Sequence, residues 1–127
     1  MPNCPCGLNK TLEKCCGRYL SGKELAPTPE ALMRSRYTAY TLSDMNYIAS
    51  TMKEPASNNF DFDESIDWCQ HTTWRGLDVR HAAQSNNTGT VEFIAHFTYN
   101  RHEDSLHEIS EFRLDDGKWY YIDGKQF

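Results

Sequence analysis

The 127-residue sequence lacks several features, and each absence excludes a class of protein. Its longest apolar runs are far too short to cross a bilayer, so we expect no membrane-spanning helix. No apolar signal-peptide core follows Met1, because a cysteine-rich motif begins at once; this favours a cytoplasmic location. The P-loop, the dinucleotide-binding G-x-G-x-x-G, the G-x-S-x-G of hydrolases and the H-E-x-x-H of metalloproteases are absent. The length allows one ordinary domain plus a small appended motif.

Cysteine is the residue type that the N-terminus has in excess. Four of the five cysteines form a C-x-C pair, Cys4 and Cys6, and a C-C pair, Cys15 and Cys16. A tetrahedral metal ion takes two thiolates from each of two turns, so this spacing predicts one structural Zn²⁺. The alternatives are a disulfide knot or free thiols, but adjacent cysteines make strained bridges and a chain without an export signal stays in a reducing compartment. We expect Cys69 to be a buried or half-buried thiol.

The cysteine pattern resembles the SEC-C motif, the zinc-binding element named after the C-terminus of the SecA translocation ATPase. Its spacing, C-x-C, eight residues and then C-C, is met in full, and we call residues 1–22 the knuckle. The loop from Gly7 to Lys14 departs from the usual Gly-Ser-Gly run followed by lysines and an aromatic residue, which dilutes its basic character. The resemblance implies metal binding by the four cysteines. It also implies a protein or ribosome partner, because the SecA motif contacts a chaperone and the ribosome.

The net charge of −5 is unevenly distributed. Residues 1–40 carry six basic and three acidic residues, a net charge of +3, while residues 41–127 carry seven basic and fifteen acidic residues, a net charge of −8. A basic knuckle on an acidic body suits contact with an acidic protein surface, or with nucleic-acid phosphate over a small footprint. The candidates for that contact are Lys10, Lys14 and Arg18. A solvated surface without a partner is the alternative.

Residues 23–127 are predicted to form one domain that begins with helices. Three are expected, each after a capping residue: 29–42 after Thr28, 45–52 after Asp44, and 64–70 after Asp63. From Trp74 the hydrophobic period becomes alternating, and strands are predicted over residues 74–84, 90–100, 105–114 and 118–123. We expect a four-residue loop that pairs Asn100 with Ser105, and a two-residue turn that pairs Asp115 with Lys118.

Helices followed by an antiparallel meander indicate an α+β fold. A long, curved, four-stranded sheet wrapped around a helical hairpin is an NTF2-like cone, with a generic α+β sandwich as the alternative. The run PEALMRSRYTAY from Pro29 to Tyr40, between the cysteine motif and a meander with Trp74 and Trp119, is similar to the uncharacterised bacterial YchJ family. The resemblance implies a SEC-C motif over residues 1–22 and an NTF2-like domain over 23–127. It also allows a homodimer, because NTF2-like sheets often dimerise.

The predicted pairing places polar side chains inside the cone. Glu108, Ser110 and Asp123 fall on the apolar face of the sheet, strand alternation brings His81 to the same side, and Arg36 faces them from the first helix. A carboxylate there would have a raised pKa and could act as a general base. The weak catalytic candidates are Glu108, Asp123, His81 and Tyr40. The alternative is a structural ion pair of Arg36 with either carboxylate; a bulged turn at residues 115–117 would turn Asp123 outward.

These observations favour a non-catalytic, zinc-binding adaptor that meets a protein or ribosome partner through its knuckle. The second hypothesis is an NTF2-like small-molecule-binding protein or enzyme with acidic residues in a cone pocket. Zinc is the one cofactor expected.

Overall fold

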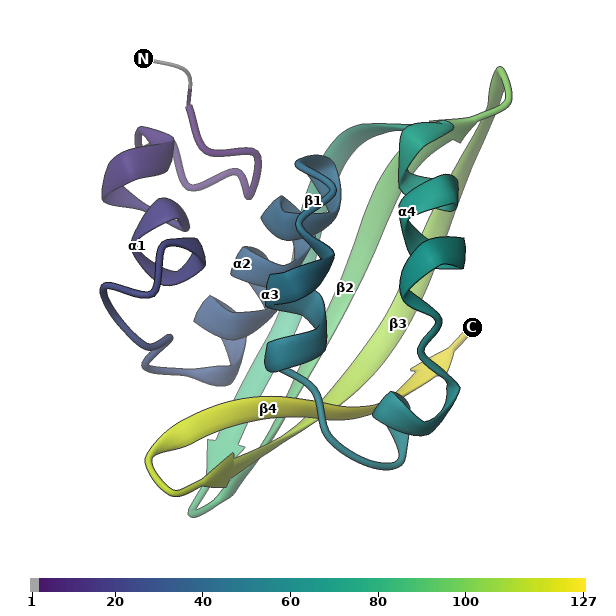
Figure 1. Cartoon of the computed structure of the whole chain (residues 1–127). Helices are drawn as coiled ribbons and strands as arrows, with labels where there is room; N and C mark the ends of the chain where they lie inside the picture. Colours follow the sequence, from purple (N-terminus) through teal and green to yellow (C-terminus); the bar gives the residue numbers. More distant parts are fainter. Residues whose placement is uncertain (1–2) are drawn as a thin grey trace.

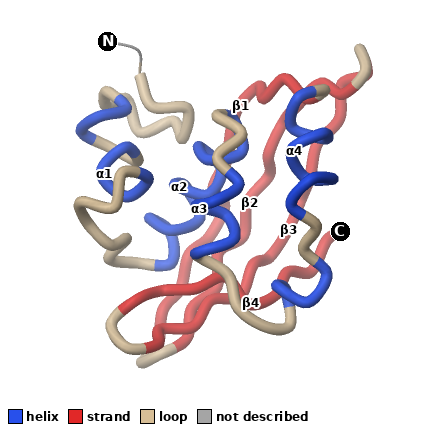
Figure 2. The backbone as a smooth tube through the Cα atoms, in the orientation of Figure 1, coloured by secondary structure: helices blue, strands red, loops and turns tan. Residues whose placement is uncertain are grey.

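The computed structural model describes residues 3–127 as helices followed by one antiparallel sheet (Figure 1). The helical elements are η1 (Leu12–Lys14), α1 (Gly17–Leu20), α2 (Pro29–Thr41), α3 (Met45–Ser50), η2 (Ala56–Asn59) and α4 (Phe62–Gln70). The strands are β1 (Thr72–Ser85), β2 (Thr88–Tyr99), β3 (His102–Asp115) and β4 (Lys118–Gln126), in the spatial order β1-β2-β3-β4. The predicted α+β class and the four-stranded meander are confirmed (Figure 2).

Side-chain caps decide where the helices begin. The starts of α2 and α3 are as predicted, since Thr28 and Asp44 each accept a hydrogen bond from the backbone N–H three residues further on. The cap predicted at Asp63 is wrong. Asp61 caps α4 instead, because its Oδ1 accepts the N–H of Glu64 at 2.9 Å. An aspartate followed three residues later by a glutamate is close to the capping-box pattern, and that signal favours Asp61.

The turn between β2 and β3 is shorter than predicted. Asn100 and Arg101 both have positive φ, 49° and 70°, and form a two-residue turn that pairs Tyr99 with His102. The expected pairing of Asn100 with Ser105 is therefore wrong, and each residue of β2 pairs four positions earlier in β3. Because four is an even number, every side chain keeps its predicted face.

Two bulges in β1 change which side chains enter the cone. The register shifts between Trp74 and Gly76, and again between Val79 and His81. Before the first shift, Trp74 pairs with Phe97 on the inner face. Beyond the second shift His81 is exposed on the outer face, so its predicted place inside the cone is wrong.

A bulge in β4 has the same consequence for Asp123. The predicted turn is present, since Asp115 pairs with Lys118. Further along the strand, the register shifts so that Ile122 has no partner in the ladder, and Asp123 pairs with Glu111 on the exposed outer face. The prediction that Asp123 lies inside the cone is wrong, because a bulge within the strand changes its face.

The core lies between α2 and the inner face of the sheet. Its buried cluster is Leu32, Met33 and Tyr37 of α2 with Val91, Phe93, Ala95, Phe112 and Trp119. A second cluster joins α3 to α4 and includes Cys69, which is buried as predicted. Figure 1 shows α2, α3 and α4 on one side of the sheet, with the knuckle on the far flank of α2 from α4. None of the helices over residues 3–127 is both long and apolar enough to span a bilayer.

Candidate functional site

The four N-terminal cysteines form one buried cluster. The Sγ atoms of Cys4, Cys6, Cys15 and Cys16 all lie within 4.8 Å of one another, and these residues are at most 4% exposed. The sulfurs of Cys6 and Cys15 are 3.5 Å apart, far beyond the roughly 2.0 Å of a disulfide bond. None of the four forms a disulfide bond, and the sulfurs converge as their spacing predicts.

The backbone of the knuckle makes this convergence possible. The N–H of Cys4 donates to the carbonyl of Lys10 at 2.7 Å, and the N–H of Gly7 donates to the carbonyl of Cys4 at 3.3 Å. Gly7 has a φ of 92°, which a residue with a Cβ adopts only under strain, so glycine is needed directly after the C-x-C pair. Cys15 and Cys16 lie between η1 and α1. Their thiols point toward those of the C-x-C pair.

The geometry and the donor chemistry fit a tetrahedral metal ion. Sulfur ligands at about 2.3 Å from zinc lie about 3.8 Å from one another. The closest contact of 3.5 Å and the outer limit of 4.8 Å bracket that separation. Four thiolates select a soft or borderline metal over Mg²⁺ or Ca²⁺. Because the protein supplies all four ligands, the metal would stabilise the folded knuckle and leave no open position for a substrate.

The pKa values of the clustered thiols are shifted in opposite directions. A hydrogen bond from the Cys16 thiol lowers the pKa of Cys6 to about 5, although burial opposes this effect. The same contact, together with burial, raises the pKa of Cys16. Burial raises the pKa of Cys15 to about 11. Since at least two of the thiols hold their protons firmly, binding of a divalent cation would release protons.

Helix α2 holds the knuckle against the rest of the chain. Nη1 of Arg34 donates to the carbonyl oxygen of Cys6 at 2.6 Å, and its Nε pairs with Glu30 one turn away at 2.9 Å. Oγ1 of Thr38 lies 3.6 Å from the sulfur of Cys4, and Thr38 is fully buried. The knuckle is therefore docked on the domain through polar contacts that reach the turn carrying Cys4 and Cys6.

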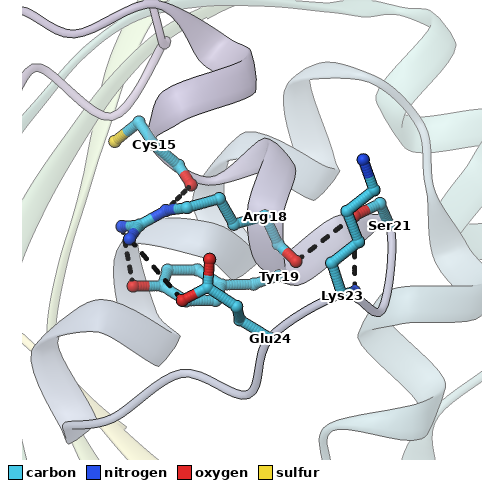
Figure 3. Close-up of polar contacts among 6 residues, drawn as sticks. All are labelled: Cys15, Arg18, Tyr19, Ser21, Lys23 and Glu24. Carbon is cyan, nitrogen blue, oxygen red and sulfur yellow. Dashed lines mark hydrogen bonds and ion pairs between the residues drawn. The ribbon is translucent and has the colours of Figure 1, made fainter.

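The three predicted basic contact residues differ in whether their side chains are available to a partner. Lys10 and Lys14 are exposed, and so is Leu8, which is 45% exposed in the same loop. Figure 3 shows that Arg18 is engaged within the knuckle. Its Nε donates to the carbonyl of Cys15 at 3.0 Å and its Nη2 to the hydroxyl of Tyr19 at 2.9 Å. The surface left for a partner is Leu8, Lys10 and Lys14, which we call the knuckle tip.

A cavity of about 550 Å³ lies between α2, α4 and the inner face of the sheet. Tyr40 and Glu108, two of the four catalytic candidates, line it together with Arg36. The other two candidates, His81 and Asp123, are exposed and do not line it, for the register reasons given above.

Arg36 does not form the predicted ion pair with Glu108. Its Nη1 donates to the carbonyl of Ile48 at 2.9 Å and to Oγ1 of Thr51 at 2.7 Å, so the end of α3 replaces the expected carboxylate. Its guanidinium carbon lies 4.7 Å from the centre of the Tyr121 ring. Desolvation lowers the pKa of Arg36, while the neighbouring groups act in the opposite direction.

Glu108 is held by two hydroxyl donors. Its Oε2 accepts from Oγ of Ser110 at 2.5 Å and from the hydroxyl of Tyr121 at 3.2 Å, and the residue is 7% exposed. Burial raises the pKa of Tyr121, and the charge of Glu108 adds to that effect, so the tyrosine keeps its proton and remains a donor. Burial also raises the pKa of Tyr40, against the opposing charge of Arg36. The carboxylate is thus fixed at the base of the cavity.

Residues 28–124 match the family described as YchJ, middle NTF2-like domain. The chain belongs to the YchJ family. A UPF0225 protein of Enterobacter sp. (strain 638) is 41% identical over 124 residues, which cover 95% of this chain and 81% of the relative. The predicted resemblance to YchJ proteins is confirmed.

Two solved structures of SEC-C motif containing proteins share the fold of this YchJ protein. The solution structure from Rhodopseudomonas palustris has a TM-score of 0.91 at 41% identity and covers 99% of both chains. The crystal structure from Psychrobacter arcticus has a TM-score of 0.82 at 28% identity, and covers 94% of this chain and 80% of that one. The NTF2-like cone with a cysteine cluster at its N-terminus is therefore the fold of this chain.

Sequence reasoning missed the part of the cavity that α4 supplies in this YchJ protein. Asp61, Glu64, Ser65 and Trp68 line it at the spacing i, i+3, i+4 and i+7, which places them on one helix face. That spacing could have shown which face α4 turns inward. It could not have shown that the face covers the cone, because packing of Trp68 against Trp74, with ring centres 5.3 Å apart, fixes the helix there.

Proposed function

We propose that this chain is a non-catalytic adaptor whose knuckle is folded around one structural Zn²⁺ and binds a protein partner. The observation that carries the zinc assignment is the convergence of four buried sulfurs within 4.8 Å. Thiolate ligands and a closed coordination sphere favour zinc in a structural role over a reactive metal.

The experiment for the metal is elemental analysis of freshly purified, reduced and untagged protein. We expect about one zinc per chain. The matched variant is Cys16→Ser, which should lose the zinc, while Cys69→Ser changes a buried thiol outside the cluster and should retain it. Substoichiometric zinc in the wild-type protein would overturn the assignment.

The adaptor role is supported by the knuckle tip. Leu8 and Lys10 lie exposed on one loop and Lys14 ends the adjoining η1, and this combination suits a partner with an acidic surface around an apolar depression. The docking of the knuckle on α2 holds the tip in a fixed orientation, which lowers the entropic cost of binding. The SEC-C resemblance suggests a protein or the ribosome as the partner, and the basic charge of the tip suits an acidic protein surface.

The partner can be tested by placing a photo-crosslinking residue at Asn9, within the tip. We expect a discrete crosslinked protein whose yield falls at least about tenfold when Lys10 and Lys14 are both changed to Glu. The control is Lys125→Glu, an exposed lysine at the opposite end of the chain. An unchanged crosslink in the double variant, or an equal loss in the control, would contradict binding through the tip.

No reaction is assigned to the cone in this proposal. The two hydroxyl donors hold one oxygen of Glu108 in place, and this favours an anchoring role over that of a general base.

A further inference from the structure

The cone cavity contains a buried cation whose hydrogen-bond donors are only partly used. Arg36 is 7% exposed and lines the cavity. Within residues 3–127 its hydrogen bonds all come from Nη1 and go to two neutral acceptors, Ile48 and Thr51. Apart from an interaction with the hydroxyl of Tyr40, the guanidinium has no further side-chain partner among these residues, and none of their carboxylates forms an ion pair with it. The charge of Glu108 acts on the guanidinium from a distance, but no carboxylate contacts it, so an anionic group that accepts hydrogen bonds from its remaining donors would be stabilised.

A second donor of the cavity wall also lacks an acceptor. Nε1 of Trp74 is a buried N–H without a hydrogen-bond partner within the part of the chain that the structure describes. Trp74 lines the same cavity as Arg36. Buried donors are nearly always paired in folded proteins, so this N–H is a donor that an acceptor on a bound molecule would satisfy.

The remaining wall is mostly aromatic and apolar. The rings that line it include Tyr37, Tyr40, Phe60, Trp68, Phe93 and Tyr99. The volume of about 550 Å³ falls in the range of small-molecule sites, which is about 300–1,000 Å³. A flat apolar body of a few ring atoms would therefore fill the space beside the guanidinium.

The rim limits the charge that can enter. Asp61, Glu64 and Asp67 of α4 are exposed and line the cavity, and Glu108 places a fourth carboxylate near its base. These charges repel phosphates and other multiply charged anions more strongly than a singly charged one. The single positive charge of the buried guanidinium matches a ligand that carries one carboxylate.

We propose that the cone cavity binds a small monocarboxylate with an aromatic or similarly flat apolar body, whose carboxylate accepts hydrogen bonds from Arg36. The site lies away from the knuckle and does not depend on the adaptor role. It involves binding only, with no covalent step.

The test uses the full-length, zinc-loaded protein and 3-phenylpropionate as the probe, followed by ¹H–¹⁵N NMR. The three tryptophans give resolved indole N–H signals, and Trp74→Phe identifies that of Trp74. We expect saturable shifts of the Trp74 indole signal and of the Arg36 Nε–H signal. The neutral 3-phenylpropionamide and the dianionic phenyl phosphate should each bind at least about tenfold more weakly. Equal or tighter binding of either compound, or no binding of the carboxylate at millimolar concentration, would overturn the proposal.

Variants separate the proposal from a general loss of folding. Glu108→Gln keeps an acceptor for Ser110 and Tyr121 but removes a negative charge near the carboxylate, so binding of 3-phenylpropionate should tighten by about three- to tenfold. Glu111→Gln makes the same change on the exposed outer face of β3 and should leave the affinity unchanged. Arg36→Lys keeps the charge but loses the fork of donors, and should weaken binding. Unchanged or weaker binding in Glu108→Gln would contradict a carboxylate at this place.

Discussion

Arg34 and Cys6 are joined by a 2.6 Å hydrogen bond from the guanidinium of one to the backbone carbonyl of the other, across 28 residues of sequence. The bond reaches from the middle of α2 into the turn that carries the first cysteine pair. It couples the stability of the knuckle to the helix that also forms one wall of the cone.

Arg34→Met is expected to weaken this coupling. Loss of a charge-assisted hydrogen bond should lower the free energy of unfolding by about 1–3 kcal/mol. It should also speed the loss of metal to a chelator, since the turn around Cys6 is less firmly held. Urea unfolding and the rate of zinc transfer to a chromogenic chelator measure the two effects. Glu30→Gln is the control, because it removes the ion pair with Arg34 and leaves the bond to Cys6; an equal effect of both variants would show that the ion pair matters instead.

Metal removal should unfold the knuckle and spare the cone. The cysteine cluster and the main core share no residue, so chelation is expected to abolish the dispersed NMR signals of residues 3–22 while those of the sheet persist. Four thiols should become reactive toward a disulfide reagent, and Cys69 should stay protected. Global unfolding on chelation, or fast reaction of all the thiols before it, would contradict this division.

The buried thiol of Cys69 predicts a loss of stability at high pH. Burial raises its pKa from 9.0 to about 11, so the folded state keeps a proton that the unfolded state releases. The contribution is fully present below pH 9 and is lost as the pH rises toward 11, by about 2–3 kcal/mol in all. The free energy of unfolding of the wild-type protein should fall more steeply over this window than that of Cys69→Ala. Parallel curves for the two proteins would exclude Cys69 as the titrating group.

Gly124 should not tolerate a side chain. A Cβ at this position would lie 2.5 Å from Oε2 and 2.6 Å from Cδ of Glu108, and would also crowd the hydroxyl of Tyr121. Gly124→Ala is therefore expected to destabilise the protein by about 1–3 kcal/mol through overpacking, measured by urea unfolding. Lys125→Ala changes the exposed neighbour and should have little effect. The double variant Glu108→Ala with Gly124→Ala should be destabilised by less than the sum of the two single variants. Without the Glu108 side chain, the added methyl group has room.

The sequence was informative where periodicity decides the outcome, and less so where single residues interrupt it. The caps at Thr28 and Asp44 and the cysteine cluster follow from local patterns, as does the inner face that carries Glu108. His81 and Asp123 were misplaced because each lies just beyond a bulge. A glycine within a strand is typical of a bulge, and Gly76 marks the first shift in β1, but no glycine marks the shift between Val79 and His81.

The same reasoning explains the error at Arg36. A buried arginine opposite a carboxylate suggests an ion pair, yet the carbonyl of Ile48 and the hydroxyl of Thr51 occupy its Nη1. The direction in which the end of α3 presents these groups depends on how α2 and α3 meet, and sequence patterns do not specify that angle.

Next to the bulge that turns Asp123 outward, the outer edge of β4 pairs with the segment that follows α3. The N–H of Tyr121 donates to the carbonyl of Thr51 at 2.8 Å, and the N–H of Lys53 donates to the carbonyl of Tyr121 at 3.0 Å. The backbone N–H and carbonyl of Tyr121, which could otherwise pair with another strand, therefore already form hydrogen bonds within the molecule. The edge of the sheet is therefore covered at Tyr121, and a strand of another copy could not pair with β4 along its whole length.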